Sequence, residues 1–247
     1  MLIHRALRIA RRLAPALALP TAVLAQSPLN LGPATADGEP RLMAGVDFTV
    51  AQPAGQFKQY VSNGFGVGVH GLARLGGLGA FALRVDGNFV QYGSETKRVN
   101  LSPTVGGRIQ VDLNTSNNIV WFGVGPQLMA PRGPVRPYVN GTVGFSYFAT
   151  ESSVKGLNDG ESLLHNTNYD DFVFSYSGGT GVLIPIAHGR RTLVFLDLGA
   201  RFHNNGRTSY LREGGIEDLP GGGIALHTID SNANLWTYHV GVSIGGR

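Results

Sequence analysis

The chain of 247 residues contains no cysteine, so it can form neither disulfide bonds nor thiolate metal sites. Beyond residue 25 it also lacks any apolar run of about 18 residues, which excludes a transmembrane helix from the remaining chain. Long polar tracts are scarce, whereas glycine occurs 36 times. This composition argues against a helical protein and against simple disorder.

Residues 1–25 have the layout of a secretory signal peptide. Four arginines precede an apolar run from Leu13 to Leu24. Val23 and Ala25 occupy the −3 and −1 positions of a cleavage point before Gln26, as in such signals. We therefore expect residues 1–25 to direct export by the Sec route and to be removed from the mature protein.

The net charge of the chain comes largely from this first segment. Removing its four arginines from the 20 Lys and Arg leaves 16, which equals the 16 Asp and Glu. The exported chain is formally neutral, and its charge gives no reason to expect a nucleic-acid partner. We expect residues 26–40 to form an unstructured lead-in and residues 41–247 to form one domain.

The domain repeats a single pattern in which apolar residues alternate with small or polar ones. Alternation with a period of two indicates strands with two different faces, and segments of about 10 residues match the length of a tilted strand that crosses a bilayer. Pro126 removes one ladder donor from the fourth segment. The eight segments are residues 42–50, 64–75, 79–90, 119–129, 137–148, 172–184, 192–203 and 235–244.

The connections between these segments alternate strictly between long and short. Long connections at 51–62, 92–118, 149–171 and 204–233 alternate with short ones at 76–78, 130–136 and 185–191. Short periplasmic turns and longer extracellular loops are typical of barrels in an outer membrane. The sequence therefore predicts an all-β fold, an eight-stranded antiparallel up-and-down transmembrane β-barrel with both ends on the periplasmic side.

The apolar faces of the segments carry an aromatic belt. Its members lie near the ends next to the long loops, where aromatic rings favour the bilayer interface. The belt consists of Phe48, Phe65, Phe89, Phe122, Phe145, Tyr147, Phe172, Phe174, Phe202, Trp236 and Tyr238.

The opposite faces carry ionisable residues of both signs. Eight strands enclose room only for side chains, so we expect Arg and Asp to pair in a filled lumen. The predicted lumen network consists of Asp47, His70, Arg74, Arg84, Asp86, Asp197, Arg201, His203 and His239.

Over residues 41–247 this architecture resembles the small outer-membrane β-barrel proteins of the OmpA/OmpX-like kind. The resemblance implies a location in the bacterial outer membrane, contact with its lipid and lipopolysaccharide, and a monomer. It also implies that the barrel-assembly machinery reads the last strand, "LWTYHVGVSI". The usual signal ends on an aromatic residue, whereas this chain ends Ile244-Gly-Gly-Arg247.

Two motifs that suggest chemistry lie in the wrong context. Gly66–Gly71 matches G-x-G-x-x-G and Gly241–Gly245 matches G-x-S-x-G, but both fall in alternating segments with no helix after them. Acidic groups in "LNDGES" and "NTNYDD" lack a spaced calcium-loop signature and are interpreted as solvated loop charge. We therefore expect no catalytic residue, no cofactor and no metal.

The long connections are the expected functional surface. Residues 208–230 predict a hairpin with its turn at 219–222, and residues 94–113 predict a similar extension, both with strand edges open to partners. We expect a structural or surface-interaction and adhesion role without catalysis. The alternatives are a lipid A acyltransferase or deacylase that uses His203 and His239, a soluble lipocalin-like binder with inverted faces, and a narrow ion pore.

Overall fold

The computed structural model describes residues 39–76, 79–100, 110–156, 162–189, 192–219 and 223–246. The chain divides into units of residues 1–31 and 32–247, and all described residues belong to the second. The expected signal peptide and most of the expected lead-in lie outside the described residues.

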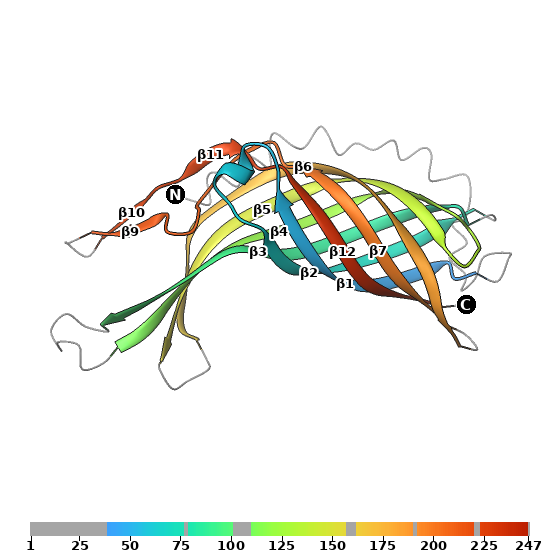
Figure 1. Cartoon of the computed structure of the whole chain (residues 1–247), viewed down its shortest axis with the longest axis horizontal. Coiled ribbons are helices and arrows are strands. Elements are labelled where there is room, and N and C mark those ends of the chain that lie inside the picture. The colour runs from blue at the N-terminus through green and yellow to red at the C-terminus, as the bar shows by residue number, and fades with distance from the viewer. Residues whose placement is uncertain are drawn as a thin grey trace, which may run out of the picture. The chain divides into compact units, whose positions relative to one another are not determined.

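Eight strands form a closed barrel in the order β1-β12-β7-β6-β5-β4-β3-β2 (Figure 1). Every neighbouring pair is antiparallel. The predicted eight-stranded antiparallel barrel is confirmed. The strands are β1 (Leu42–Pro53), β2 (Gly64–Leu75), β3 (Phe81–Asn100), β4 (Gln110–Met129), β5 (Arg136–Gly156), β6 (Ser162–His188), β7 (Thr192–Asn204) and β12 (Leu235–Gly246).

The last strand closes the barrel against the first. β12 pairs with β1 from Gly245 opposite Met43 to Leu235 opposite Pro53, and with β7 on its other side. Because side chains alternate across a strand, Trp236, Tyr238, Val240, Val242 and Ile244 all lie on the outer side of the wall, whereas Leu235 lies on the inner side.

Four strands are much longer than the segments predicted from alternation. β3, β4, β5 and β6 have 20, 20, 21 and 27 residues, and they continue beyond the barrel as a four-stranded sheet (Figure 1). The predicted extension within residues 94–113 is present, with Asn100 opposite Gln110. The interpretation of residues 149–171 as a plain connection is wrong, because β5 and β6 pair as far as Lys155 and Ser162.

The fourth long connection carries small strands of its own. β8 (Arg207–Tyr210) pairs with β11 (Ile229–Asn232), and β9 (Ile216–Asp218) pairs with β10 (Ile224–Leu226). The β9–β10 pair is the hairpin expected within residues 208–230. Asp171 on β6 fastens β8 to the sheet by accepting hydrogen bonds from the Thr208 hydroxyl at 2.7 Å and the Ser209 amide at 2.8 Å.

Pro126 is accommodated within β4 at a local gap in the ladder. It lies opposite Leu83 on β3, whereas β4 and β5 pair at Val124–Val143 and resume only at Gln127–Asn140. The register is the same on both sides of the gap. The lost N–H donor therefore interrupts one ladder without shifting the strand.

The interior of the barrel is layered. One buried apolar cluster fills the end next to the short turns, and a second fills the end next to the long connections, with charged side chains between them. The turn-end cluster is Met43, Leu72, Ala82, Met129, Tyr138, Leu183, Leu193 and Phe195. The loop-end cluster is Ala51, Phe57, Val61, Val90, Tyr92, Ile119, Trp121, Phe148, Tyr210, Ala233 and Leu235.

Candidate functional site

The middle of the lumen is crossed by a carboxylate held between two guanidinium groups. Arg84 on β3 donates through Nε to Oδ1 of Asp86 at 2.6 Å, and Arg201 on β7 donates through Nη1 to Oδ2 at 2.7 Å. Arg84 also donates to the side-chain oxygen of Gln127 at 3.1 Å. All four side chains are buried, and charge-assisted bonds of this length compensate part of the cost of that burial.

A second network joins the other two lumen aspartates through histidines. His70 on β2 lies 3.3 Å from Asp47 through Nδ1 and 3.5 Å from Asp197 through Nε2. The Tyr138 hydroxyl donates to Asp197 at 2.7 Å and lies 3.1 Å from Nε2 of His239. The structure therefore joins Asp47, His70, Asp197 and His239 in one network. Tyr138, a residue that sequence reasoning did not include, joins it through Asp197 and His239.

His70 also contacts Ser243, in an arrangement that resembles a hydrolytic triad. Nε2 of His70 is 2.8 Å from Oγ of Ser243, while its other ring nitrogen faces Asp47. Ser243 belongs to the G-x-S-x-G match, which the absence of a following helix had set aside. Its parity with His239 on the last strand places it in the lumen, but its contact with His70 depends on closure of the barrel.

The surroundings of Ser243 leave no room for a substrate. Ser243 is 0% exposed. A side chain added at Gly45, opposite it on β1, would collide with His70 and with the Ser243 hydroxyl. An acyl-transfer site needs space for the reacting carbonyl beside the nucleophile. The Asp47–His70–Ser243 group is therefore a packed hydrogen-bond network.

The turn end of the lumen holds an ion pair from the predicted lead-in. Arg136 on β5 donates to both carboxylate oxygens of Glu39, at 2.8 and 3.2 Å, and its guanidinium lies 4.9 Å from the ring centre of Phe195. Arg74 on β2 is buried 3.9 Å from the same carboxylate. Sequence reasoning placed Arg74 in the lumen but missed Glu39 and Arg136, because it assigned these two residues to the lead-in and to a short turn.

The loop end of the lumen is closed by an aromatic plug. A short 3-10 helix, η1 (Phe57–Gln59), inserts Phe57 against Tyr92, Phe148 and Tyr210 with ring centres 4.9 to 6.1 Å apart. The Tyr92 hydroxyl donates to the Leu211 carbonyl at 3.1 Å, and burial raises the pKa of Tyr92.

His203 lies directly beneath this plug. Its ring is 4.8 Å from that of Trp121, and its Nε2 is 3.1 Å from the Thr237 hydroxyl. The lipid A enzyme alternative needs a histidine that is accessible to lipid at the outer end, whereas His203 is buried. Buried side chains thus occur along the described lumen from the turns to the loops.

The outer wall of the barrel is apolar and exposed. Val46 is 62% exposed and Val69 is 57% exposed, while Asp47 and His70, which follow them directly in the sequence, are buried on the inner side. The alternative of a soluble binder with inverted faces is therefore wrong. An apolar wall around a charged, hydrogen-bonded interior is the construction of a membrane-spanning barrel of the bacterial outer membrane.

The structure places the predicted aromatic belt on this outer wall. Phe48, Phe65, Phe89, Phe122, Phe172, Phe174, Trp236 and Tyr238 are exposed, and Phe145, Tyr147 and Phe202 are partly covered by their neighbours. Rings from adjacent strands pack together, with Phe145 and Phe172 centred 4.9 Å apart and Phe202 and Trp236 5.1 Å apart.

Within the described ranges, no helix is long and apolar enough to cross a membrane. Nor does that part of the chain contain a group of three or more His, Asp or Glu side chains placed to hold a metal ion. Asp159 and Glu161, from the acidic loop motif, lie outside the described residues.

Comparison with known proteins gives structural similarity only. No family model and no curated protein matches the sequence. Neisserial surface protein A (NspA) shares 12% identity and a TM-score of 0.44, over 83% of this chain and 97% of that one. Ail of Yersinia pestis, solved with the heparin analogue sucrose octasulfate, shares 10% identity and a TM-score of 0.39 over 82% and 96%.

The N-terminal β-barrel domain of Pseudomonas aeruginosa OprF is also similar. It shares 10% identity and a TM-score of 0.30, over 83% of this chain and 96% of that one. At such low identities and TM-scores, the evidence for the architecture of this chain is its own strand register, its buried charges and its exposed apolar wall.

Proposed function

We propose that this protein is a non-catalytic surface-interaction protein, in which the barrel anchors the β3–β6 extension as a docking surface for other proteins. The observation that carries the proposal is an open strand edge. β2 stops pairing with β3 at Gln91, yet β3 continues to Asn100 with β4 as its only neighbouring strand among the described residues. Unpaired edges of this kind accept an extended segment of a partner as an additional strand.

The side chains of the extension favour display over burial. Ser94 and Thr96 share the amide oxygen of Asn114, at 3.3 and 3.2 Å, and Arg98 pairs with Asp112 at 3.2 Å on the exposed surface. A sheet with such polar surfaces gains little stability from packing on a core. This favours a role for the extension in what it presents outside the membrane.

The charge of the loop side favours a neutral or basic polypeptide as the partner. Its described acidic residues outnumber its described basic residues. The acidic residues are Glu95, Asp112, Glu151, Asp170, Asp171, Glu213, Glu217, Asp218 and Asp230, and the basic ones are Lys58, Lys97, Arg98, Arg207 and Arg212. A sulfated ligand of the kind bound to Ail would meet net repulsion here.

Other parts of the proposal concern the membrane. We propose that residues 1–25 act as the Sec signal, that the barrel-assembly machinery reads β12, and that the barrel works as a monomer surrounded by outer-membrane lipid and lipopolysaccharide. The closed β1–β12 seam supports a monomer, because the barrel leaves no transmembrane strand edge for a second copy.

The experiment measures adhesion of bacteria that display the chain to surfaces coated with extracellular-matrix proteins. Of two neighbouring residues in an antiparallel edge strand, one points its N–H to the partner strand and the other points it outward. Of Thr96→Pro and Lys97→Pro, one therefore removes an N–H that bonds to β4, and the other removes only an N–H that points outward from the edge. We expect that variant to lose adhesion while the barrel still changes mobility on boiling in detergent.

A matched control removes the other extension of the loop side. Replacing residues 217–225 by Asn-Gly joins Ile216 to Leu226, which already face each other across the β9–β10 pair. This variant should adhere as the parent does. Unchanged adhesion of both proline variants would overturn the docking role of the β3 edge.

A further inference from the structure

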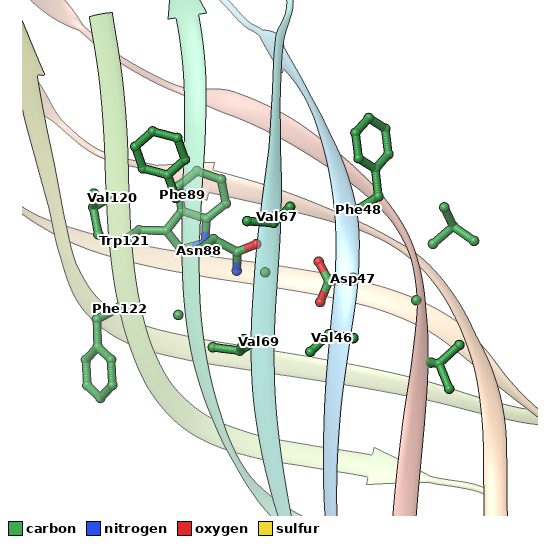
Figure 2. Close-up of a pocket in the computed structure, with 15 residues that line it drawn as sticks. Val46, Asp47, Phe48, Val67, Val69, Asn88, Phe89, Val120, Trp121 and Phe122 are labelled. Carbon is green, nitrogen blue, oxygen red and sulfur yellow. The ribbon is translucent and has the colours of Figure 1, made fainter. Parts of the chain in front are cut away.

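The outer wall carries a continuous apolar trough across five neighbouring strands. Two adjoining hollows of about 700 and 630 Å³ lie over β12, β1, β2, β3 and β4. Figure 2 shows the larger hollow, where Val46, Val67, Val69, Phe89 and Phe122 project from four of these strands. The two hollows meet at Val46, Val69, Gly87, Phe122 and Val242, which line both.

The trough exists because two outward positions have no side chain. Gly71 on β2 and Gly87 on β3 occupy outward positions, whereas Val69 and Phe89 next to them are exposed bulky residues. In the register, Gly87 lies between Val69 and Phe122, and Gly71 lies between Ala44 and Val85. The missing side chains leave a floor of backbone between ridges of valine and phenylalanine.

The direction of the trough suits an extended hydrocarbon chain. From Gly71 to Gly87 it steps one strand across, about 5 Å, and two residues along the strand, about 7 Å. That diagonal makes an angle of about 35° with the strands, which is close to the tilt of strands in outer-membrane barrels. A chain seated in the trough therefore lies near the membrane normal, the mean direction of lipid tails.

The surroundings restrict the occupant to hydrocarbon. The trough is continuous with the membrane-facing wall, where water is absent and the medium is lipid tails. Phe48 and Phe89 line its end toward the long loops, and both belong to the aromatic belt that lies at the bilayer interface on that side. The trough therefore opens toward the outer leaflet, whose lipid is lipopolysaccharide.

We propose that the trough over Gly71 and Gly87 is a binding site for one acyl chain of lipid A. The absence of side chains at both glycines then leaves the room that the acyl chain needs. A leucine side chain at either position would occupy part of that room. The site lies on the membrane-embedded wall and is separate from the β3 edge, so it rests on the membrane placement of the barrel and not on an adhesive role.

The structure allows this space to be filled without damaging the barrel. A Cβ atom built at Gly71 meets no atom within 4 Å, and one at Gly87 meets only Cγ2 of Val69, at an ordinary 3.5 Å. Gly178 on β6 provides a matched control. It also faces lipid, a Cβ there approaches only the Asn140 carbonyl at 4.0 Å, and it lies outside the trough.

The test is native mass spectrometry of the full barrel in mild detergent, titrated with purified lipid A or with phosphatidylethanolamine. We expect the parent and Gly178→Leu to retain one lipid A at lower concentration than phosphatidylethanolamine. Gly71→Leu and Gly87→Leu should weaken lipid A binding about tenfold, the loss expected when about two methylene groups lose their contacts. A mobility change on boiling verifies folding of each variant.

Three results would overturn the site. The first is lipid A binding by Gly87→Leu at the parental concentration, and the second is equal binding of both lipids by every variant. The third is a dimer of the parent that Gly87→Leu separates, because a second copy of the chain would then be the occupant. None of these results bears on adhesion, so this proposal and the docking role of the β3 edge fail independently.

Discussion

Arg201 on β7 reaches across the lumen to Asp86 on β3, with Nη1 of the arginine 2.7 Å from Oδ2 of the carboxylate. The other oxygen of Asp86 accepts a bond from Arg84 at 2.6 Å. One buried carboxylate thus bridges two guanidinium groups, one on β3 and one on β7, which are far apart in sequence. Opposite sides of the barrel are thus tied together by charge as well as through the strand ladder.

Removing this carboxylate should strongly destabilise the barrel. Asp86→Ala leaves Arg84 and Arg201 buried without their shared acceptor, and breaking a buried pair from one side costs about 3 to 5 kcal/mol. Urea unfolding in detergent, followed by tryptophan fluorescence, measures the free energy of unfolding. Asp112→Ala is the control, because its pair with Arg98 is exposed and should cost at most about 1 kcal/mol. Equal losses in the two variants would contradict the bridging role of Asp86.

The predictable part of the fold is the part in which alternation and burial agree. Strands inside the membrane need an apolar face and a polar face, so β1 or β12 could be placed from its own residues. The extension of β5 and β6 beyond Ala149 was missed because both of its faces are polar and no period-two hydrophobic signal remains. The structure forms strands there through backbone pairing with β4 and through contacts such as Thr115 with Ser152 at 2.9 Å.

The sequence allowed us to predict which residues face the lumen, but not which of them contact one another. Parity alone turns Asp47, His70 and Asp86 inward, whereas their contacts depend on closure of the barrel. Ser243 and His70 are 173 positions apart in the sequence and become neighbours only through β1. Glu39 and Phe57 were missed for a different reason, because they come from segments without any periodic pattern.

The Asp47–His70–Ser243 group should behave as packing rather than as a nucleophile site. Ser243→Ala removes one buried hydrogen bond to His70, at a cost of about 1 kcal/mol in the free energy of unfolding. A serine-directed fluorophosphonate probe should leave the folded parent unlabelled, since the hydroxyl is buried. Labelling that disappears in Ser243→Ala would show that this hydroxyl reacts as a nucleophile and would contradict the packing role.

The aromatic plug should control access to the first long connection. Phe57→Ala removes a ring that touches three others, so we expect η1 to detach from the barrel mouth and trypsin to cut at Lys58 at least several times faster. Tyr60→Ala is the matched control, because Tyr60 is in the same connection but is exposed. Equal cleavage rates for the two variants would show that Phe57 does not hold this segment.

The raised pKa of Tyr92 makes the plug sensitive to high pH. Burial disfavours the charged phenolate, so the pKa of Tyr92 in the folded protein lies above its unfolded value of about 10. The linked stabilisation is fully present below about pH 10 and is lost as the pH rises beyond that value toward the folded pKa. Near-ultraviolet circular dichroism should therefore show the aromatic plug loosening between about pH 10 and 12. Tyr92→Phe should remove part of this pH dependence, whereas the exposed Tyr60→Phe should leave it unchanged, and an identical profile for both variants would assign the transition to other groups.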